Sequence, residues 1–402
     1  MTITKQAVIL AAGKSTRCYP LTITRPKSML TVAGKTIIEH SLDQLVGVVE
    51  EAIIIVGYKK EMLIEFLGKE YRGLKISYVE QKEQGGTAHA LLQAEKAVKS
   101  DFLALYGDDI YFKEDIKELT KHKFAILAKE HEEPQRFGVV EHTNGKLIEI
   151  AEKPRKPKSN LINIGVYKLN SAIFDIIRQT EKSVRAEIEL PDAVNALAKK
   201  DKVEVVQAKN WLPNGYPWDL LETNSALLAN LLKTGKNQIK GTVEKGATLK
   251  GTIILGKNSI IKAGSYIEGN VFIGENTTIG PNCYIRGSTS IGDNCKIGQS
   301  VEIKNSIIMN NSKVPHLSYV GDSIIGEHVN IGAGTIIANL RHDKTNIKSM
   351  VKDKLVDTGR HKFGAVIGDN VNTGINTTIY PGRIMWPGKS TLPGESVIKD
   401  IK

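Results

Sequence analysis

Short apolar runs and longer stretches of helical spacing alternate through the first part of the chain. The runs Ala7 to Leu10, Ala52 to Val56 and Phe102 to Tyr106 have the length and composition of buried strands. Strands that alternate with helical segments are typical of a largely parallel sheet covered by helices. The pattern therefore predicts an α/β domain over this part of the chain.

Two helices are expected near the end of this region. Pro191 precedes a stretch of helical spacing, and proline is tolerated in the first turn of a helix because no N–H is needed there. A last helix is expected over Leu220 to Leu232, and it runs into the polar residues 233–238. We place the domain boundary there, which gives domains at 1–232 and 233–402.

After this boundary the apolar positions recur every six residues. Glycine follows many of them, and glycine suits tight turns because it accepts left-handed backbone angles at little cost. Successive coils stack their aliphatic residues into one continuous core, so this period predicts a parallel β-helix of hexapeptide repeats. The isoleucines at this spacing are Ile267, Ile273, Ile279, Ile285, Ile291, Ile297 and Ile303, with the phase resumed at Ile325, Ile331, Ile337, Ile367 and Ile379.

The six-residue rhythm fails twice, over residues 309–322 and 338–364. Breaks in a repeat architecture map to loops, and loops carry function more often than the coils do. We therefore expect two functional loops in the second domain.

Composition excludes several classes of protein. No run approaches the ~20 apolar residues that a membrane-spanning helix needs, and the basic residues are dispersed without a nucleic-acid motif. Cys18, Cys283 and Cys295 lack the spacing of a zinc site, so we assign them no metal or redox role. We expect a cytoplasmic protein with no membrane or nucleic-acid partner.

The net charge of +11 leaves two interpretations open. A positive surface steers anionic ligands such as nucleotides, sugar phosphates and coenzyme A toward the protein. The joint abundance of lysine, glutamate and isoleucine also fits a heat-adapted surface with many ion pairs.

The segment from Leu10 to Arg17 places a glycine-bearing loop directly after a predicted strand, where backbone N–H groups can face a phosphate. The loop is neither a Walker A loop nor a dinucleotide fingerprint. Further motifs follow in order, and together they resemble the sugar-1-phosphate nucleotidyltransferase family across the whole first domain. These motifs are Arg25-Pro26-Lys27-Ser28-Met29-Leu30, Gln84-Gly85-Gly86-Thr87-Ala88, Tyr106-Gly107-Asp108, Glu152-Lys153-Pro154 and Asn163-Ile164-Gly165.

This resemblance implies a Rossmann-like nucleotidyltransferase domain and a role for each matching residue. Arg17 and Lys27 are expected to neutralise charge at the reacting phosphorus, and Asp108 and Asp219 to bind Mg²⁺ or another divalent cation. Developing negative charge at a phosphorus needs a metal and fixed cations to spread it. The residues implied to bind the nucleotide are Leu10, Ala11, Ala12, Gly13, Gln84, Gly86 and Thr87, and those implied to bind the sugar phosphate are Gly138, Glu152, Lys153 and Asn163.

Lys304 precedes the segment from His316 to Asp322 in the first interruption, Asn330 to Thr335 follow that interruption, and Ala338 to Arg341 stand at the edge of the second. This arrangement resembles the acetyltransferase half of bifunctional enzymes that make UDP-N-acetylglucosamine, and the resemblance implies that the β-helix is left-handed. His316 stands where that family has its general base, and an imidazole near neutral pKa suits proton transfer from an amine. The other implied site residues are Lys304, Tyr319, Asn330, Ala338 and Asn339. Leu340 stands where an aromatic residue is usual, and residues 348–362 are basic and match no part of the pattern.

The leading hypothesis is a bifunctional enzyme. Its β-helix would acetylate glucosamine-1-phosphate with acetyl-CoA as co-substrate, and its first domain would transfer uridylyl from UTP to the product. The alternative keeps only the nucleotidyltransferase, with the β-helix as an oligomerisation or regulatory module. A stand-alone acyltransferase is disfavoured because Lys27 and Asp108 are intact. The resemblance implies a homotrimer, and the choices between UTP and dTTP and among sugar phosphates stay open.

Overall fold

A computed structural model describes residues 4–233 and 235–402. The chain forms two compact units that do not follow a single cut in the sequence. The first unit comprises Met1–Lys14, Pro26–Met29 and Ile37–Pro213. The second comprises Ser15–Arg25, Leu30–Thr36 and Asn214–Lys402.

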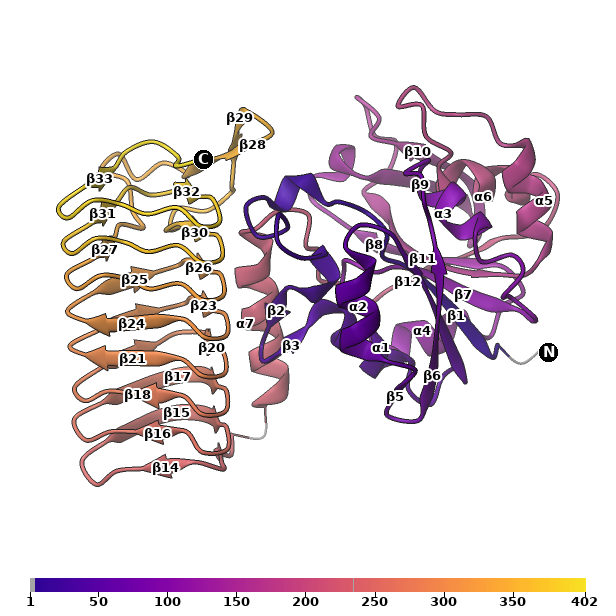
Figure 1. The fold of residues 1–402 in the computed structure, drawn as a ribbon. Coiled ribbons are helices and arrows are strands. Elements are labelled where there is room, and N and C mark those ends of the chain that lie inside the picture. The colour runs from indigo at the N-terminus through magenta and orange to yellow at the C-terminus, as the bar shows by residue number, and fades with distance from the viewer. Residues whose placement is uncertain (1–3, 234) are drawn as a thin grey trace. The chain divides into compact units, whose positions relative to one another are not determined.

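One ten-stranded sheet organises the first unit (Figure 1). Its strands, in spatial order, are β5 (Glu70–Tyr71), β6 (Leu74–Glu80), β4 (Glu51–Val56), β1 (Gln6–Leu10), β7 (Phe102–Tyr106), β11 (Leu161–Leu169), β8 (Ala125–Glu130), β12 (Glu204–Gln207), β10 (Lys146–Glu152) and β9 (Gly138–Thr143). The strands expected from the apolar runs are confirmed as β1, β4 and β7.

Parallel pairing joins β6, β4, β1 and β7, as the alternating pattern predicts. Strand β11 then runs antiparallel to β7 and β8, and β10 runs antiparallel to β9 and β12. Short links join β9 to β10, and antiparallel strands can be joined by a tight hairpin without a crossover helix. The parallel part is the one whose strand ends carry the phosphate loop.

Helices cover both faces of this sheet. Along β1, Val8 belongs to one apolar cluster, and its neighbours Ala7 and Ile9 belong to the other, because successive side chains of a strand point to opposite faces. The first cluster takes in α3 (Thr87–Leu92), α5 (Ala172–Gln179) and α6 (Leu190–Ala198), and the second takes in α1 (Ile37–Leu45), α2 (Lys60–Leu67) and α4 (Lys113–Leu119). The helix expected after Pro191 is confirmed as α6.

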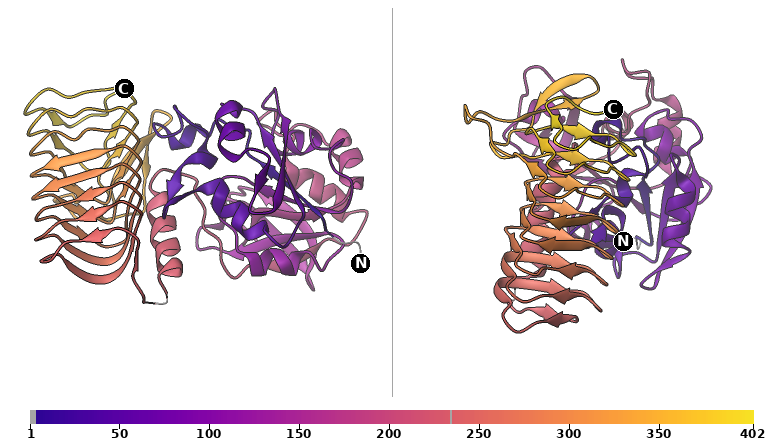
Figure 2. Two further views of the ribbon diagram at one scale, coloured as in Figure 1. Left: turned by 60° about the horizontal axis from the view of Figure 1, so that its bottom comes forward. Right: turned by 60° about the vertical axis from the view of Figure 1, so that its left-hand side comes forward.

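The second unit begins its continuous part with α7 (Asp219–Leu231), which confirms the expected last helix, and continues as a stack of coils (Figures 1 and 2). Three parallel ladders run along this coil region. Their strands are β13 (Gln238–Ile239), β14 (Thr242–Val243), β15 (Thr248–Leu255), β16 (Ile260–Ile261), β17 (Tyr266–Ile273), β18 (Thr278–Ile279), β19 (Tyr284–Arg286), β20 (Thr289–Ile291), β21 (Lys296–Gln299), β22 (Glu302–Lys304), β23 (Ile307–Ile308), β24 (Lys313–His316), β25 (Tyr319–Gly321), β26 (Ile324–Ile325), β27 (Ile336–Ile337), β30 (Val366–Ile367), β31 (Thr378–Ile379), β32 (Ile384–Met385) and β33 (Ser396–Val397).

The six-residue period sets the size of each coil. Ile267 of β17 pairs with Ile285 of β19, and Ile285 pairs with Ile303 of β22, so each coil contains three hexapeptides. These isoleucines are fully buried in one apolar cluster that runs along the stack. Each repeat therefore contributes to a core that no repeat could bury alone.

The first expected loop is absent as a loop, which corrects the prediction for residues 309–322. Lys296 pairs with Lys313 and Ile303 pairs with Val320, so this coil is one residue shorter than its predecessors and stays in the stack. Val314 and Val320 are fully buried and fill the positions that isoleucine holds elsewhere. The rhythm failed in the sequence because two successive coils are each one residue shorter than three hexapeptides and because valine replaces isoleucine.

The second interruption is a true insertion. Ile337 pairs with Ile379, so residues 338–364 lengthen one coil well beyond three hexapeptides. The inserted residues form an antiparallel hairpin of β28 (Lys348–Val351) and β29 (Lys354–Asp357). The basic segment that matched no family pattern is therefore a projecting hairpin.

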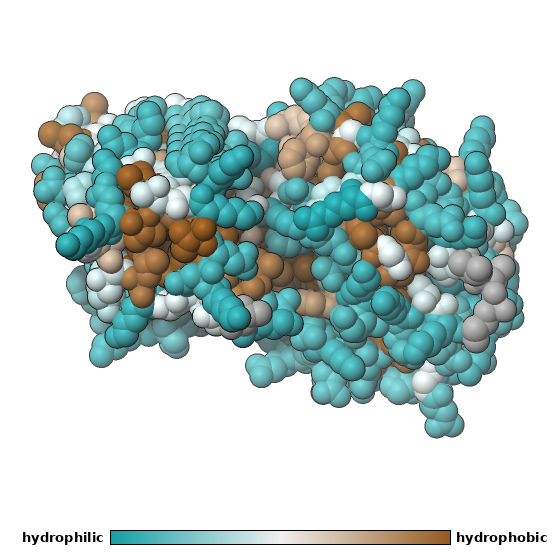
Figure 3. All heavy atoms as spheres, turned by 90° about the horizontal axis from the view of Figure 1, so that it is seen from below, coloured by the Kyte–Doolittle hydropathy of each residue, from teal (hydrophilic) through white to brown (hydrophobic). Residues whose placement is uncertain are grey.

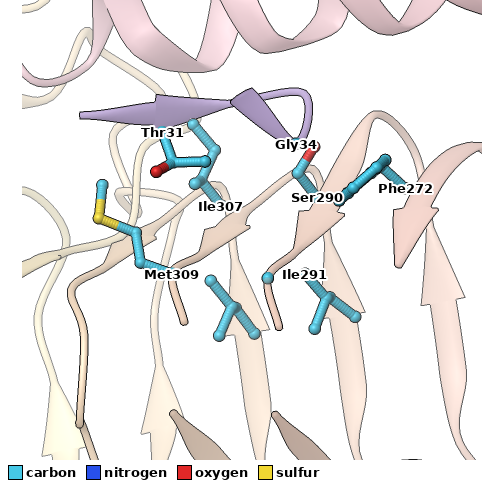
Figure 4. A pocket seen from close by; sticks show the side chains of 9 residues that line it. Thr31, Gly34, Phe272, Ser290, Ile291, Ile307 and Met309 are labelled. Atoms are coloured by element: carbon cyan, nitrogen blue, oxygen red, sulfur yellow. The ribbon is translucent and has the colours of Figure 1, made fainter. Parts of the chain in front are cut away.

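Two short segments from early in the sequence also belong to the second unit. Strands β2 (Thr31–Val32) and β3 (Lys35–Thr36) form a hairpin, and Gly34 at its turn lies so close to the Phe272 ring that a Cβ would come within 2.3 Å of it. A pocket beside this hairpin has a volume of about 10 Å³ and is lined by Thr31, Gly34, Phe272 and coil residues (Figure 4). That is space for about one water molecule, so the pocket is a packing gap.

The end of the coil stack that carries β14 presents apolar side chains (Figure 3). Val243, Ala247 and Leu249 belong to this first coil, and they are only partly buried against the core because no earlier coil covers them. Among the described residues, no helix is long and apolar enough to cross a membrane.

Candidate active sites

The predicted phosphate loop lies at the carboxyl end of β1, where ligands of open α/β sheets bind. The Gly107 N–H donates to the Leu10 carbonyl oxygen at 3.0 Å, so the loop after β7 is fixed to the loop after β1. The Ala12 carbonyl oxygen accepts from the Gln84 side-chain amide at 2.7 Å and from the Tyr58 N–H at 3.1 Å. Three segments thus hold the loop, whose Gly13 is exposed.

Two further glycines, neither of them predicted as a site residue, pack against this loop. A Cβ on Gly57 would lie 2.9 Å from the Ala12 carbonyl oxygen, and one on Gly107 would lie 3.0 Å from the Ala11 Cβ. Neither site admits a side chain without a shift. The signal in the sequence was a glycine directly after each of the predicted strands that end at Val56 and Tyr106.

Gly86 and Thr87, both predicted to bind the nucleotide, stand at the N-terminus of α3, with Gly86 as the N-cap. Gly86 has a φ of +103°, which disfavours a side chain, and a Cβ there would lie 2.5 Å from the Ile188 carbonyl oxygen. The Thr87 hydroxyl accepts from the Leu190 N–H at 2.8 Å. Residues 186–192, which match the family pattern only in part, therefore support the start of α3.

Lys27 and Asp108 form an ion pair within the first unit, with Nζ 2.9 Å from Oδ2. The Lys27 side chain is 4% exposed, whereas that of Asp108 is 39% exposed. A buried ammonium therefore lies against a carboxylate that solvent and ligands can reach.

Arg17 and Asp219 lie in the second unit, and both contact the segment around Tyr216. The Arg17 guanidinium lies 5.5 Å from the Tyr216 ring centroid, a cation–π distance. The Tyr216 ring stacks on Trp218 at 4.7 Å, and the Tyr216 N–H donates to Asp219 Oδ2 at 2.8 Å. The predicted cation and metal ligand are thus held by one aromatic segment.

The predicted sugar-phosphate residues gather on β9, β10 and β11. Gly138 pairs with Glu152, and a Cβ on Gly138 would lie 3.3 Å from Glu152 Oε2 and 3.8 Å from the Asn163 Cβ. Lys153 follows Glu152 and lies 3.4 Å from its carboxylate, Nζ to Oε1. The structure therefore brings all four residues together.

A tyrosine pair fixes Asn163. The Asn163 amide donates to the Tyr167 hydroxyl at 2.6 Å, and this hydroxyl lies 3.3 Å from that of Tyr106. The Tyr106 ring covers Gly165, where a Cβ would come within 2.2 Å of it. Burial raises the pKa of Tyr167 to about 12, so both hydroxyls stay protonated as hydrogen-bond donors at neutral pH.

Acidic residues of α6 and the preceding segment lie near Glu152. Arg185 bridges them, with Nη2 3.3 Å from Glu152 Oε1 and 2.9 Å from Glu189 Oε1. Burial raises the pKa of Glu189 and of Asp192. Arg185, Glu189 and Asp192 were not predicted from the sequence as part of the site.

In the second unit, a buried carboxylate collects the predicted acetyltransferase residues. Asp322 is 3% exposed and accepts hydrogen bonds from Lys304 Nζ at 2.8 Å, from the Asn305 amide at 2.8 Å and from the Asn339 amide at 2.5 Å. The Asn339 amide also donates to the Tyr319 hydroxyl at 3.0 Å. Asp322 was missed as a site residue, although it ends the motif that begins at His316.

His316 ends β24, and its side chain is exposed. Its carbonyl oxygen accepts from the Ser318 hydroxyl at 2.7 Å, which fixes the turn into Tyr319. Asn330 is exposed and pairs with Lys313 in the preceding coil, and the Ala338 N–H donates to the Ile379 carbonyl oxygen. No described contact joins His316, Asn330 or Ala338 to the Asp322 cluster.

The outer surface near this cluster is apolar. Tyr319 pairs with Ile336, which is 43% exposed, and Leu317 and Leu340 are also exposed. Burial raises the pKa of Tyr319, with Asp322 adding to the effect, so its hydroxyl stays protonated at neutral pH. Exposed apolar side chains beside polar ones are typical of a surface that another molecule covers.

Over residues 4–233 and 235–402, no three histidine, cysteine, aspartate or glutamate side chains are grouped as a metal site. This excludes an all-protein cage in that part of the chain. It is compatible with Mg²⁺, which is commonly bound by one or two carboxylates together with substrate phosphates.

Two family models match this chain, one in each half. The nucleotidyl transferase family model matches residues 6–230, and the model of the GMPPB C-terminal domain matches residues 267–392. The bifunctional protein GlmU of Methanocaldococcus jannaschii is 44% identical over 96% of this chain and 94% of its own length. The bifunctional sugar-1-phosphate nucleotidylyltransferase/acetyltransferase of Sulfurisphaera tokodaii is 42% identical over 98% of each chain.

A solved structure matches the first part of the chain. The crystal structure of a UDP-glucose pyrophosphorylase in complex with UDP-glucose is 26% identical, with a TM-score of 0.53. The match covers 56% of this chain and 99% of the other.

Proposed function

Because the chain belongs to the family of bifunctional sugar-1-phosphate nucleotidylyltransferases/acetyltransferases of the GlmU type, we propose that it makes a UDP-amino sugar in two steps. The first step acetylates glucosamine-1-phosphate, and the second transfers uridylyl from UTP to N-acetylglucosamine-1-phosphate. The carrying observation is that each half of the chain brings predicted residues together: Lys27 pairs with Asp108, and Lys304 and Asn339 both bind Asp322.

In the proposed acetyl transfer, the sugar amine attacks the thioester carbonyl carbon of acetyl-CoA. A C–N bond forms, the C–S bond breaks, and coenzyme A leaves as a thiolate. His316 takes the proton from the amine and passes it to the leaving thiolate. Lys304, Tyr319, Asn330, Ala338 and Asn339 are proposed to bind the substrates, and the hydrogen bonds to Asp322 support a fixed geometry for Lys304 and Asn339.

In the proposed uridylyl transfer, an oxygen of the sugar phosphate attacks the α-phosphorus of UTP, and the bond to the β-phosphate breaks to release pyrophosphate. Lys27 and Arg17 balance the charge that builds up on the phosphate oxygens. The exposed loop at Gly13 is proposed to hold the phosphates, and Gln84, Gly86 and Thr87 to hold the base. Gly138, Glu152, Lys153 and Asn163 are proposed to bind the sugar phosphate.

Asp108 and Asp219 are proposed to hold Mg²⁺ or another divalent cation. Carboxylate oxygens are the ligands that this ion prefers, and the reachable Asp108 carboxylate fits the role. When bound, the ion would add positive charge beside the phosphates.

We also propose that the coil region is a left-handed β-helix and that residues 1–232 and 233–402 are the two functional domains. The family model that ends at residue 230 supports this division. Exposed Leu317, Ile336 and Leu340 beside the Asp322 cluster support assembly as a homotrimer with acetyl-CoA bound between neighbours. The cytoplasm, where these substrates are made, is the proposed location.

A second candidate function keeps nucleotidyl transfer alone, with the coil region as an assembly or regulatory module. Leu340 at the usual aromatic position and the hairpin of β28 and β29 in the second interruption favour it.

Selective inactivation distinguishes the two candidates. His316→Ala is expected to abolish thiol release from acetyl-CoA and glucosamine-1-phosphate and to spare pyrophosphate release from UTP. His361→Ala is the matched control, since His361 is also an exposed histidine of the coil region. Asp108→Asn is expected to abolish pyrophosphate release from UTP and to spare thiol release. Asp201→Asn is its control, since the Asp201 side chain is 37% exposed, close to the 39% of Asp108. Loss of both activities in either test variant would contradict two independent sites.

A further inference from the structure

Arg25 begins the motif that carries Lys27, yet its side chain is bound by the coil region. Its Nη2 lies 2.5 Å from Asp369 Oδ2, and its Nη1 lies 2.5 Å from Glu327 Oε1. The Thr24 hydroxyl donates to the same Asp369 oxygen at 2.6 Å. All four residues belong to the second unit.

This cluster is buried. The side chains of Arg25 and Asp369 are 9% and 5% exposed, and that of Glu327 is 21% exposed. Burial acts to lower the pKa of Arg25, but the hydrogen bonds and attraction of the two carboxylates outweigh it and raise the pKa. Because buried ion pairs add little net stability compared with apolar packing, a cluster of this kind needs another reason to be there.

The coil itself does not require these charges. Asp369 Oδ1 accepts the Glu327 N–H at 2.8 Å, and this bond joins two successive turns. Other coils have the same hydrogen bond at this position. Asp293 Oδ1 accepts from the Glu275 N–H, and Asn310 Oδ1 accepts from the Asp293 N–H at 2.8 Å. An amide therefore suffices at this turn position, and the second oxygen of Asp369 is left for Thr24 and Arg25.

The anchored segment Ser15–Arg25 carries one of the predicted phosphate-binding cations, Arg17. Tyr19, midway along the segment, packs edge-on against Trp386 of the coil region at 5.9 Å between centroids. The segment is therefore fixed at two points to coils near the end of the chain.

We propose that Arg25 is a positioning residue for nucleotidyl transfer: Asp369 and Glu327 of the coil region fix the segment that carries Arg17. This inference rests on the proposed nucleotidyltransferase function. It gives the coil region a role in the first reaction that is separate from its own proposed acetyl transfer.

Asp369→Asn tests the proposal, because the amide keeps the turn and removes the charge. Asp293→Asn is the matched control, since it makes the same substitution at the same turn position away from Arg25. We expect Asp369→Asn to lower kcat for pyrophosphate release about tenfold, since small misplacements of catalytic groups cost on that order. The KM for the sugar phosphate and thiol release from acetyl-CoA should change less than twofold, and Asp293→Asn should match wild type.

Arg25→Gln and the double variant Arg25→Gln/Asp369→Asn complete a double-mutant cycle, which tests whether the two residues act on kcat through their contact with each other. The double variant should lose no more kcat than Arg25→Gln alone, because that variant already removes the Arg25–Asp369 pair. Equal kcat for Asp369→Asn and Asp293→Asn, or a parallel loss of both activities together with the folded state in circular dichroism, would overturn the proposal. Wild type that releases no pyrophosphate from UTP or dTTP would instead contradict the proposed function and this inference with it.

Discussion

At the scale of single residues, Asp322 is the feature on which the proposed acetyltransferase site depends. Its carboxylate accepts from Lys304, Asn305 and Asn339, which come from two adjacent coils and from the edge of the insertion. Three donors directed at one buried carboxylate leave little freedom to any of them. A fixed geometry of this kind is what a reaction between two bound substrates needs.

Asp322→Asn is expected to impair acetyl transfer and to spare uridylyl transfer. The amide removes the charge that balances Lys304 and replaces an acceptor with a donor, so we expect a loss of about 1.5–3 kcal/mol of stability. Thiol release should fall at least tenfold at a temperature where the variant is folded, while pyrophosphate release stays within twofold. Asp343→Asn is the control, since Asp343 is an exposed acid of the insertion over residues 338–364. Unchanged thiol release in a folded Asp322→Asn variant would remove Asp322 from the site.

Among single residues, the sequence predicted which side chains lie together where they belong to continuous motifs. Lys27 and Asp108 were selected separately and lie 2.9 Å apart, and the four sugar-phosphate residues lie together. Gly57 was missed because a glycine after a strand is common, and only the approach of Ala12 gives this one a purpose. The chemical roles of all these residues stay predictions.

At the scale of elements, the period of six determines the coil and its core. Helix and strand positions followed from apolar spacing because burial decides both. The register of the short coils could not be predicted from the sequence, because a one-residue deletion interrupts the period in the same way as a loop does. The anchoring of Ser15–Arg25 did not follow either, because Arg25 and Asp369 are 344 residues apart and nothing local links them.

Ile303→Ala tests the continuous core of the coil region. Ile303 is fully buried between Ile285 and Val320, so its truncation leaves a cavity and should cost about 2–5 kcal/mol. Ile398→Ala is the control, since this side chain is 57% exposed and its truncation should cost less than about 1 kcal/mol. Urea denaturation followed by circular dichroism measures both. Similar urea midpoints for the two variants would contradict a continuous core to which each buried isoleucine contributes stability.

At the scale of the whole molecule, the coil region is proposed to assemble as a trimer. Exposed apolar side chains beside the Asp322 cluster favour burial against a second copy. Multi-angle light scattering of the purified protein should give three chain masses, and Ile336→Asp should lower that mass. A wild-type monomer that releases thiol would contradict acetyl-CoA binding between neighbours.

The central claim is that one chain carries both reactions, and a single incubation tests it most directly. Purified protein is given glucosamine-1-phosphate, acetyl-CoA and UTP with Mg²⁺, and free thiol and pyrophosphate are followed together. The protein's own thiols do not interfere, because burial raises the pKa of Cys283 to about 11 and that of Cys295 to about 12, and Cys18 is also buried. We predict one thiol and one pyrophosphate per UDP-N-acetylglucosamine formed. Pyrophosphate release from N-acetylglucosamine-1-phosphate without thiol release from any amino-sugar phosphate would contradict the claim.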